Sequence, residues 1–344
     1  MDNINSNRSE WGRDLNSLLL RRAGKSWSSF FGGLLSLYKD KNEAVLALLE
    51  ACESNKHHST TFHSLTVIGM GCKYLVDSLG FDEYQAIFDD ASDPKPELLN
   101  SFLKENLERV TELVINGNNS FTSARRFILP QILFSRFFSQ KSVSVNFADL
   151  GTGGGALPKE LNNKVLYDKY NKDLIWPGKA TYPFMPLNLE KAYGIEKNFN
   201  AAWVRSCFAN SNYYDQLYSD FQDANNSSHD HEVNYVELDA LESTALSDFL
   251  TQNRINAITC NFMLYQYKNT YKKKIIDAVL SNLSAPYIFL IVDPFEDYAV
   301  PGCSVGMYVS EHMEYLNFAR ISDSHYKGDI TPDSDYYLFA GKYL

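Results

Sequence analysis

The sequence predicts a chain in two parts: an all-helical stretch, then an α/β domain built on a mostly parallel sheet. Three observations support this division. Apolar residues before position 140 recur at helical spacing, and strand and helix patterns alternate from Val143 onward. The stretch from Val143 to Gly155 then joins the first strand to a glycine-rich turn. We place a helical domain at residues 1–140 and an α/β domain at residues 141–344, with residues 157–189 as an insertion.

Composition narrows the class of protein. The chain has 344 residues, 44% of them hydrophobic, which is enough for two ordinary domains with packed cores. A net charge of −10 argues against a nucleic-acid partner, because nucleic acids are bound by basic surfaces. The five cysteines are scattered, the N-terminal residues are polar, and no window approaches 18 apolar residues. We expect a soluble cytoplasmic protein that does not bind membranes.

Helical spacing of apolar residues dominates the first 140 positions. We expect helices after a cap at Asn42, over Phe62 to Leu79 with a stop at Gly80, and over Leu103 to Val114 with a stop at Gly117. A further apolar helix runs from Arg125 to Phe138, and Pro130 inside it predicts a kink or a break.

Three histidines invite a metal-site interpretation. His58 and His63 are five residues apart, so they do not share a helical face, and no carboxylate pairs with them or with His57. We interpret this segment as a solvated helix start rather than a metal site.

The second part of the chain alternates between strands and helices. The Ile255 and Tyr287 strands are continuous apolar runs, which is typical of buried parallel strands. Between strands, Asn198–Ala209 and Tyr271–Leu283 read as helices, and Asp220–His231 as a polar loop. The expected strands are Val143–Leu150, Ala192–Glu196, Val233–Leu238, Ile255–Asn261 and Tyr287–Val292, followed by a closing pair at Asn317–Ser322 and Tyr336–Tyr343.

The turn after the first strand has the composition of a ligand-binding turn. Four glycines follow Asp149 within six residues, and they permit backbone angles and close approaches that a side chain would prevent. The helix that follows offers free N–H groups at its start. Because Gly151, Gly153 and Ala156 formally satisfy the dinucleotide fingerprint, a nicotinamide cofactor is one alternative.

Each of the first five expected strands has a polar residue at its end. The set is Asp149, Glu196, Asp239, Asn261 and Asp293. In an open α/β sheet, ligands bind outside the carboxyl ends of the strands, so these side chains would line one crevice.

The segments FADLGTGGG, YGIEKN and ELDAL, in that order, resemble successive motifs of the class I S-adenosylmethionine-dependent methyltransferase superfamily. The resemblance covers about residues 143 to 344. It implies a Rossmann-like, seven-stranded sheet whose antiparallel last strand is Tyr336–Tyr343. It also implies methyl transfer from S-adenosylmethionine, which leaves S-adenosylhomocysteine. More loosely, FGGLLSLY, DLGTGGG and LYDKYNKDL resemble an uncharacterised bacterial family with a helical N-terminal half and a methyltransferase-like C-terminal half.

The resemblance assigns roles to particular residues. In that superfamily the glycine turn cradles the methionine part of the cofactor, the acid ending the second strand holds the ribose, and the acid after the third strand reads the adenine. Asp168 is a rival for the ribose, because it lies closer to the turn; we prefer Glu196. The cofactor-binding residues are then Asp149, Gly151, Thr152, Gly153, Gly155, Glu196, Lys197, Asp239, Ala240, Asn261 and Phe262.

Methyl transfer needs little chemistry from the protein, because the cofactor is already activated. A general base is needed only if the acceptor must lose a proton, and Tyr265, Glu296 and His312 are the candidates. The acidic balance favours a small molecule or a peptide as the acceptor. A non-catalytic or regulatory binding module on the same fold is the main alternative, ahead of a nicotinamide-dependent oxidoreductase. A homo-oligomer is compatible with the sequence, and the helical domain is expected to act as a substrate cap.

Overall fold

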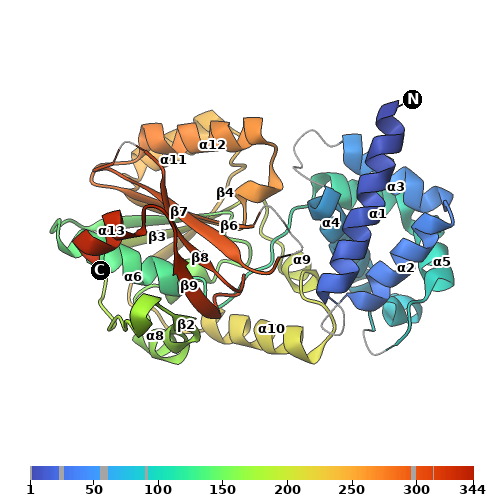
Figure 1. Cartoon of the computed structure of the whole chain (residues 1–344), viewed down its shortest axis with the longest axis horizontal. Coiled ribbons are helices and arrows are strands. Elements are labelled where there is room, and N and C mark those ends of the chain that lie inside the picture. Colours follow the sequence, from blue (N-terminus) through green and yellow to red (C-terminus); the bar gives the residue numbers. More distant parts are fainter. Residues whose placement is uncertain (1, 23–26, 55–60, 90–91, 296–299, 313) are drawn as a thin grey trace. The chain divides into compact units, whose positions relative to one another are not determined.

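The computed structural model describes residues 2–22, 27–54, 61–89, 92–295, 300–312 and 314–344. The chain divides into two compact units (Figure 1). The helical unit comprises residues 1–121, 200–218 and 266–268, and the sheet unit comprises residues 122–199, 219–265 and 269–344. Each unit is described by itself below.

The helical unit follows the apolar periodicity of its sequence. Asn42 caps a helix as expected, since its Oδ1 accepts hydrogen bonds from the backbone N–H groups of Ala44 and Val45 at 3.1 and 3.3 Å. Phe30, Leu65 and Phe102 come from three different helices and are fully buried in the core. The elements are α1 (Asp2–Arg22), α2 (Ser28–Lys39), α3 (Glu43–Ser54), α4 (Thr61–Leu79), η1 (Asp82–Phe88), α5 (Pro96–Asn116), α9 (Ala201–Ser206) and the first half of α10 (Asn212–Asn225).

The described part of the sheet unit contains nine strands in the order β2-β9-β8-β7-β6-β5-β1-β3-β4. Strands β4, β3, β1, β5 and β6 are mutually parallel, and β7, β8 and β9 continue the sheet in antiparallel pairs. The strands are β1 (Val145–Leu150), β2 (Leu174–Ile175), β3 (Leu189–Glu196), β4 (Glu232–Glu237), β5 (Ala257–Asn261), β6 (Ile288–Pro294), β7 (Cys303–Val309), β8 (Leu316–Ile321) and β9 (Gly328–Pro332).

Helices cover both faces of this sheet. α11 and α12 pack side by side on one face, and α6 and α13 lie on the other (Figure 1). Phe134 of α6 packs against Phe147 of β1 with ring centroids 6.1 Å apart, which anchors that face of the core. The helices are α6 (Ile128–Ser139), α7 (Leu157–Glu160), α8 (Lys164–Tyr170), α11 (Ser243–Gln252), α12 (Asn269–Asn282) and α13 (Tyr336–Tyr343), with short 3-10 turns at η2 (Asn171–Asp173), η3 (Pro177–Lys179) and η4 (Leu264–Gln266).

The prediction of a seven-stranded sheet closed by Tyr336–Tyr343 is wrong. The described sheet has nine strands, and that segment is helix α13. Its aromatic residues suggested a strand, but Tyr336, Phe339 and Tyr343 recur at helical spacing and all three are buried. Tyr336 stacks on Phe318 of β8 at 4.9 Å, so the helix covers the sheet instead of extending it.

Two further expectations about helices need correction. Pro130 neither kinks nor breaks a helix: α6 begins at Ile128, so Pro130 lies in its first turn, where its missing N–H has no intrahelical partner to lose. Asp220–His231 is not a single loop, because α10 runs through its first half to Asn225. α6 also belongs to the sheet unit, although the sequence placed it in the helical part.

The insertion at residues 157–189 is ordered around a buried ion network. Arg125 pairs with Asp173 at 2.9 Å and with Asp220 at 3.2 Å, and its guanidinium lies 4.5 Å from the ring centroid of Tyr170. Asp220 also pairs with Lys169 at 3.4 Å. This network links the insertion to the second half of α10 within the sheet unit.

Among the described residues, no helix has both the length and the apolar character that crossing a bilayer requires.

Candidate functional site

The glycine turn after β1 is held against the end of β3. Gly151 adopts a φ of +74°, which favours glycine, and the N–H groups of Gly151 and Thr152 both donate to the carbonyl of Ile195 at 2.9 and 3.0 Å. The N–H of Gly153 donates to Oε2 of Glu196 at 2.8 Å. The turn and the acid that the sequence analysis assigned to one site are therefore in direct contact.

Two side chains of the protein itself use the space that the glycines leave open. A Cβ atom on Gly151 would lie 2.7 Å from Cγ of Met263, and one on Gly155 would lie 2.6 Å from Cε1 of Tyr235. The hydroxyl of Tyr235 donates to the carbonyl of Gly155 at 2.6 Å. A ligand lying on this turn would therefore contact or displace Met263 and Tyr235.

Asp149, at the end of β1, is buried with 3% of its surface exposed. Burial raises the pKa of its carboxyl to about 6, although a hydrogen bond from Thr259 and the nearby charge of Arg126 oppose the rise. Oγ1 of Thr259 donates to Oδ1 of Asp149 at 2.6 Å. The carboxyl therefore titrates close to neutral pH.

Glu196, at the end of β3, behaves in a similar way. Burial raises the pKa of its carboxyl to about 7, while hydrogen bonds from the N–H groups of Gly153 and Lys197 favour its charged form. The Lys197 N–H donates to Oε1 at 3.0 Å. Both oxygens therefore accept backbone hydrogen bonds, and Glu196 would have to share or release them to hold a ligand.

Asp239 follows β4 and lies beside this group. The N–H of Leu238 donates to the carbonyl of Glu196 at 2.9 Å, which places the segment after β4 against the end of β3. Nζ of Lys197 pairs with Oδ2 of Asp239 at 3.1 Å, and Ala240 next to it is buried. The structure thus brings Glu196, Lys197, Asp239 and Ala240 together.

Asn261 ends β5, and Phe262 follows it. Oδ1 of Asn261 accepts a hydrogen bond from the Tyr326 hydroxyl at 2.9 Å. Phe262 has a φ of +55°, an uncommon conformation for a bulky residue, and such outliers often lie at functional sites. Its ring lies 4.3 Å below the guanidinium of Arg126, measured to the ring centroid.

Arg126 and Glu160 belong to this site, and the sequence analysis missed both. Arg126 is 7% exposed and electrostatically coupled to Asp149, and burial lowers the pKa of its guanidinium. Glu160 of α7 is fully buried, and burial together with the charge of Asp149 raises the pKa of its carboxyl well above the usual range. Neither lies in a motif with ligand-binding spacing, so only the folded chain reveals them.

The candidate general bases lie in different places relative to the site. The N–H of Tyr265 donates to Oδ1 of Asp293 at 3.2 Å, and the Tyr265 side chain is coupled electrostatically to Arg126, so it lies with the site. Glu296 lies outside the described residues. His312 follows the end of β7, which pairs with the first residue of β6, so it lies at the opposite edge of the sheet from the strand-end acids.

Asp168, the rival for the ribose, is not at a strand end. It lies on helix α8, where it pairs with Lys164 one turn earlier. Of the three histidines, His57 and His58 lie outside the described residues, and His63 is buried in α4 with 1% exposed rather than solvated. In the described ranges, no group of three or more His, Cys, Asp and Glu side chains could hold a metal ion.

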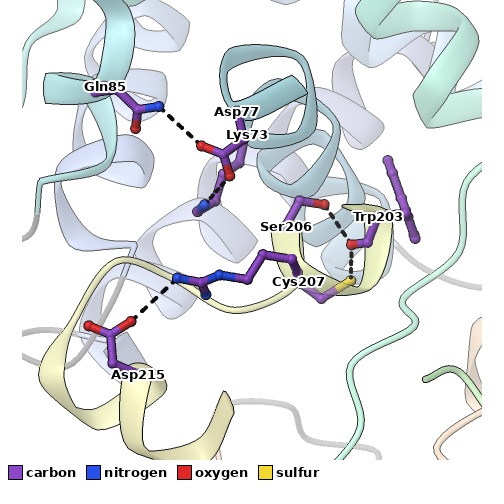
Figure 2. A network of polar contacts seen from close by, with 8 residues as sticks. Lys73, Asp77, Gln85, Trp203, Ser206, Cys207 and Asp215 are labelled. Carbon is purple, nitrogen blue, oxygen red and sulfur yellow. Dashed lines mark hydrogen bonds and ion pairs between the residues drawn. The ribbon is translucent and has the colours of Figure 1, made fainter. Parts of the chain in front are cut away.

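A second polar network lies in the helical unit (Figure 2). Lys73 of α4 pairs with Asp77 one turn along, and Asp77 also accepts a hydrogen bond from Gln85 at 3.1 Å. Arg205 pairs with Asp215 at 3.4 Å. These groups pair among themselves, so we interpret the network as structural. The Trp203 carbonyl at its edge accepts hydrogen bonds from Ser206 and Cys207, which satisfies the end of α9.

A scan against models of known protein families finds no match to this chain, and a search of curated proteins finds no significant relative.

Proposed function

We propose that this protein is an S-adenosylmethionine-dependent methyltransferase whose cofactor lies along the carboxyl ends of β4, β3, β1 and β5. One observation carries the proposal: the acids Asp149, Glu196 and Asp239 lie at the carboxyl ends of three adjacent parallel strands, around the glycine turn. Their order across the sheet suits an extended ligand with an amino-acid end, a ribose and a base.

The residues of the site fit the chemical groups of that cofactor. Glu196 would accept hydrogen bonds from the ribose hydroxyls in place of those from Gly153 and Lys197. Asp239 would face the base, and Asp149 would face the amino-acid end. These assignments remain proposals, and each names a side chain whose removal should weaken binding.

S-adenosylmethionine, when bound, supplies a methyl group that is already activated for transfer. The chain's own residues would orient the acceptor and keep water out. Met263, Phe262 and Tyr235 offer apolar surface around the glycine turn for this purpose. Tyr265 is the candidate for taking a proton, where the acceptor carries one that must be lost. The net charge of −10 favours a small-molecule or peptide acceptor.

Titration calorimetry with the full chain tests the cofactor. S-adenosylmethionine and S-adenosylhomocysteine should both bind, and NAD and NADP should not. Tighter binding of NAD than of either sulfur compound would overturn the proposal.

A labelling experiment separates an enzyme from a binding module. The protein is incubated with methyl-labelled S-adenosylmethionine and pools of small molecules, then of peptides. An enzyme transfers the label, and Asp149→Asn abolishes or strongly slows the transfer. Cofactor binding without label transfer to any pool would favour a regulatory module instead.

A further inference from the structure

Glu160 is a buried carboxyl group of the candidate site that the roles above leave unused. It is fully buried in α7, directly after the glycine turn. Neither carboxyl oxygen has a hydrogen-bond partner among the described residues. A buried polar group without a partner is costly, so a native structure that keeps one calls for an explanation.

The charges around Glu160 come from three elements. Asp149 approaches from β1, Arg125 and Arg126 from the turn before α6, and Tyr235 from β4. Arg125 is already paired with Asp173 and Asp220, and Arg126 is stacked on Phe262. Neither arginine makes a hydrogen bond to Glu160, and burial together with the charge of Asp149 raises the pKa of its carboxyl, which favours the neutral acid.

The geometry points to Glu160, with Asp149 beside it, as an acidic subsite for a protonated primary amine of the bound ligand. An ammonium group carries three N–H donors and no acceptor, so it can supply the donors that the Glu160 oxygens lack and can also donate to Asp149, which already accepts from Thr259. The inference rests on the proposed function, under which the amine belongs to the amino-acid end of the cofactor.

Occupation of this subsite has a proton balance. The ammonium group keeps its three protons and donates hydrogen bonds through them to the two carboxyls. The carboxyl proton of Glu160 then leaves for solvent, because an adjacent cation favours the ionised acid. Binding of an amine-bearing ligand therefore releases more protons than binding of a ligand without the amine, whereas any proton released by Glu196, whose pKa is about 7 and which would hold the ribose of both ligands, is common to the two.

Two ligands that share the adenosine part isolate the subsite. S-adenosylhomocysteine carries the amino-acid end, and 5′-methylthioadenosine lacks it. Calorimetry at pH 7 in two buffers of different ionisation enthalpy gives both the affinity and the number of protons released. The variants are Glu160→Gln and, as a matched control, Glu314→Gln, which removes an exposed carboxyl in the turn after β7.

The wild type and Glu314→Gln should release more protons, by up to about one, on binding S-adenosylhomocysteine than on binding 5′-methylthioadenosine. Glu160→Gln should bind S-adenosylhomocysteine at least tenfold more weakly, as expected for loss of a hydrogen bond to a charged group, and should release the same number of protons with both ligands. All three proteins should bind 5′-methylthioadenosine equally. Infrared difference spectra of the wild type provide a second test that needs no variant: the loss of protonated-carboxyl absorbance should be larger with the first ligand than with the second.

The outcomes distinguish this inference from the proposed function. Unchanged affinity and proton release in Glu160→Gln would overturn the subsite and leave the methyltransferase proposal standing. If the loss of infrared absorbance is no larger with S-adenosylhomocysteine than with 5′-methylthioadenosine, the subsite is likewise refuted. If the wild type binds neither adenosine compound, both proposals fail together.

Discussion

Lys73 in the helical unit and Glu160 in the sheet unit are both ionisable and almost fully buried, at 1% and 0% exposed. Burial favours the neutral form of each side chain, so it lowers the pKa of Lys73 and raises the pKa of Glu160. Lys73 has a carboxylate partner one turn along its own helix. Glu160 has no hydrogen-bond partner among the described residues.

The difference separates a group that we interpret as structural from one that we propose binds a ligand. A buried charge with a partner nearby in the chain has its interactions satisfied within the protein, so no ligand is needed to explain it. A buried carboxyl without one lowers stability, so its retention calls for an explanation, and a bound ligand is the one that we propose. Burial or a shifted pKa alone would not have distinguished the two.

The largest expected effect comes from removing the partner of Lys73. Asp77→Ala leaves a buried ammonium group unpaired and should lower the free energy of unfolding by about 3 kcal/mol. Lys73→Met removes the charge but keeps most of the side-chain volume, so it should cost less than about 1 kcal/mol. Urea unfolding of the full chain compares the two. Equal losses would mean that packing, and not charge pairing, is what matters at this position.

The next effect concerns the pH dependence of stability. The pKa of Asp149 is about 6 in the folded chain against an ordinary 3.8, so between these pH values the folded state holds a proton that the unfolded state has lost. Stability should therefore fall as pH rises from about 4 to 6, by about 3 kcal/mol from this group. Asp149→Asn, which can still accept the Thr259 hydrogen bond, should remove that part of the slope. Parallel stability curves for the wild type and the variant would contradict this.

Glu160→Leu should move stability in the opposite direction to Asp77→Ala. Replacing an unpartnered buried carboxyl with an apolar side chain should raise the free energy of unfolding by about 2 kcal/mol, while abolishing the extra proton release with S-adenosylhomocysteine described above. Thermal and urea unfolding measure the first effect. A clear loss of stability would show that the carboxyl is satisfied within the folded chain.

The smallest expected effect separates Glu196 from Asp168. Glu196→Ala should weaken binding of S-adenosylhomocysteine about tenfold, because hydrogen bonds to a charged group are lost. Asp168→Ala should leave the affinity unchanged, because Asp168 lies on α8 and pairs with Lys164. Calorimetry on both variants decides, and the reverse ranking would move the ribose to α8.

The five parallel strands could be predicted because each carries apolar residues, in a continuous run or in alternation, with a polar residue at or just after its end. The strand at Cys303–Val309 was missed, although Val305, Met307 and Val309 alternate with more polar neighbours. Segment Tyr336–Tyr343 was misassigned because aromatic residues favour strands, whereas their helical spacing decided the outcome.

Part of the candidate site could be predicted from the sequence for a similar reason. Asp149, Glu196 and Asp239 stand at strand ends, so the topology of a parallel sheet brings them together. Glu160 and Arg126 reach the site from a short helix and a turn, and their neighbours are residues distant in sequence. Tertiary packing alone brings these residues into the site, so no local sequence pattern predicts them.

The most direct test of the account is a crystal structure of the full chain with S-adenosylhomocysteine. We expect the ligand to lie over the glycine turn, with its ribose hydroxyls on Glu196, its base beside Asp239 and its amino group between Asp149 and Glu160. A ligand bound with its ribose on Asp168, or with its amino group away from Glu160, would contradict the account.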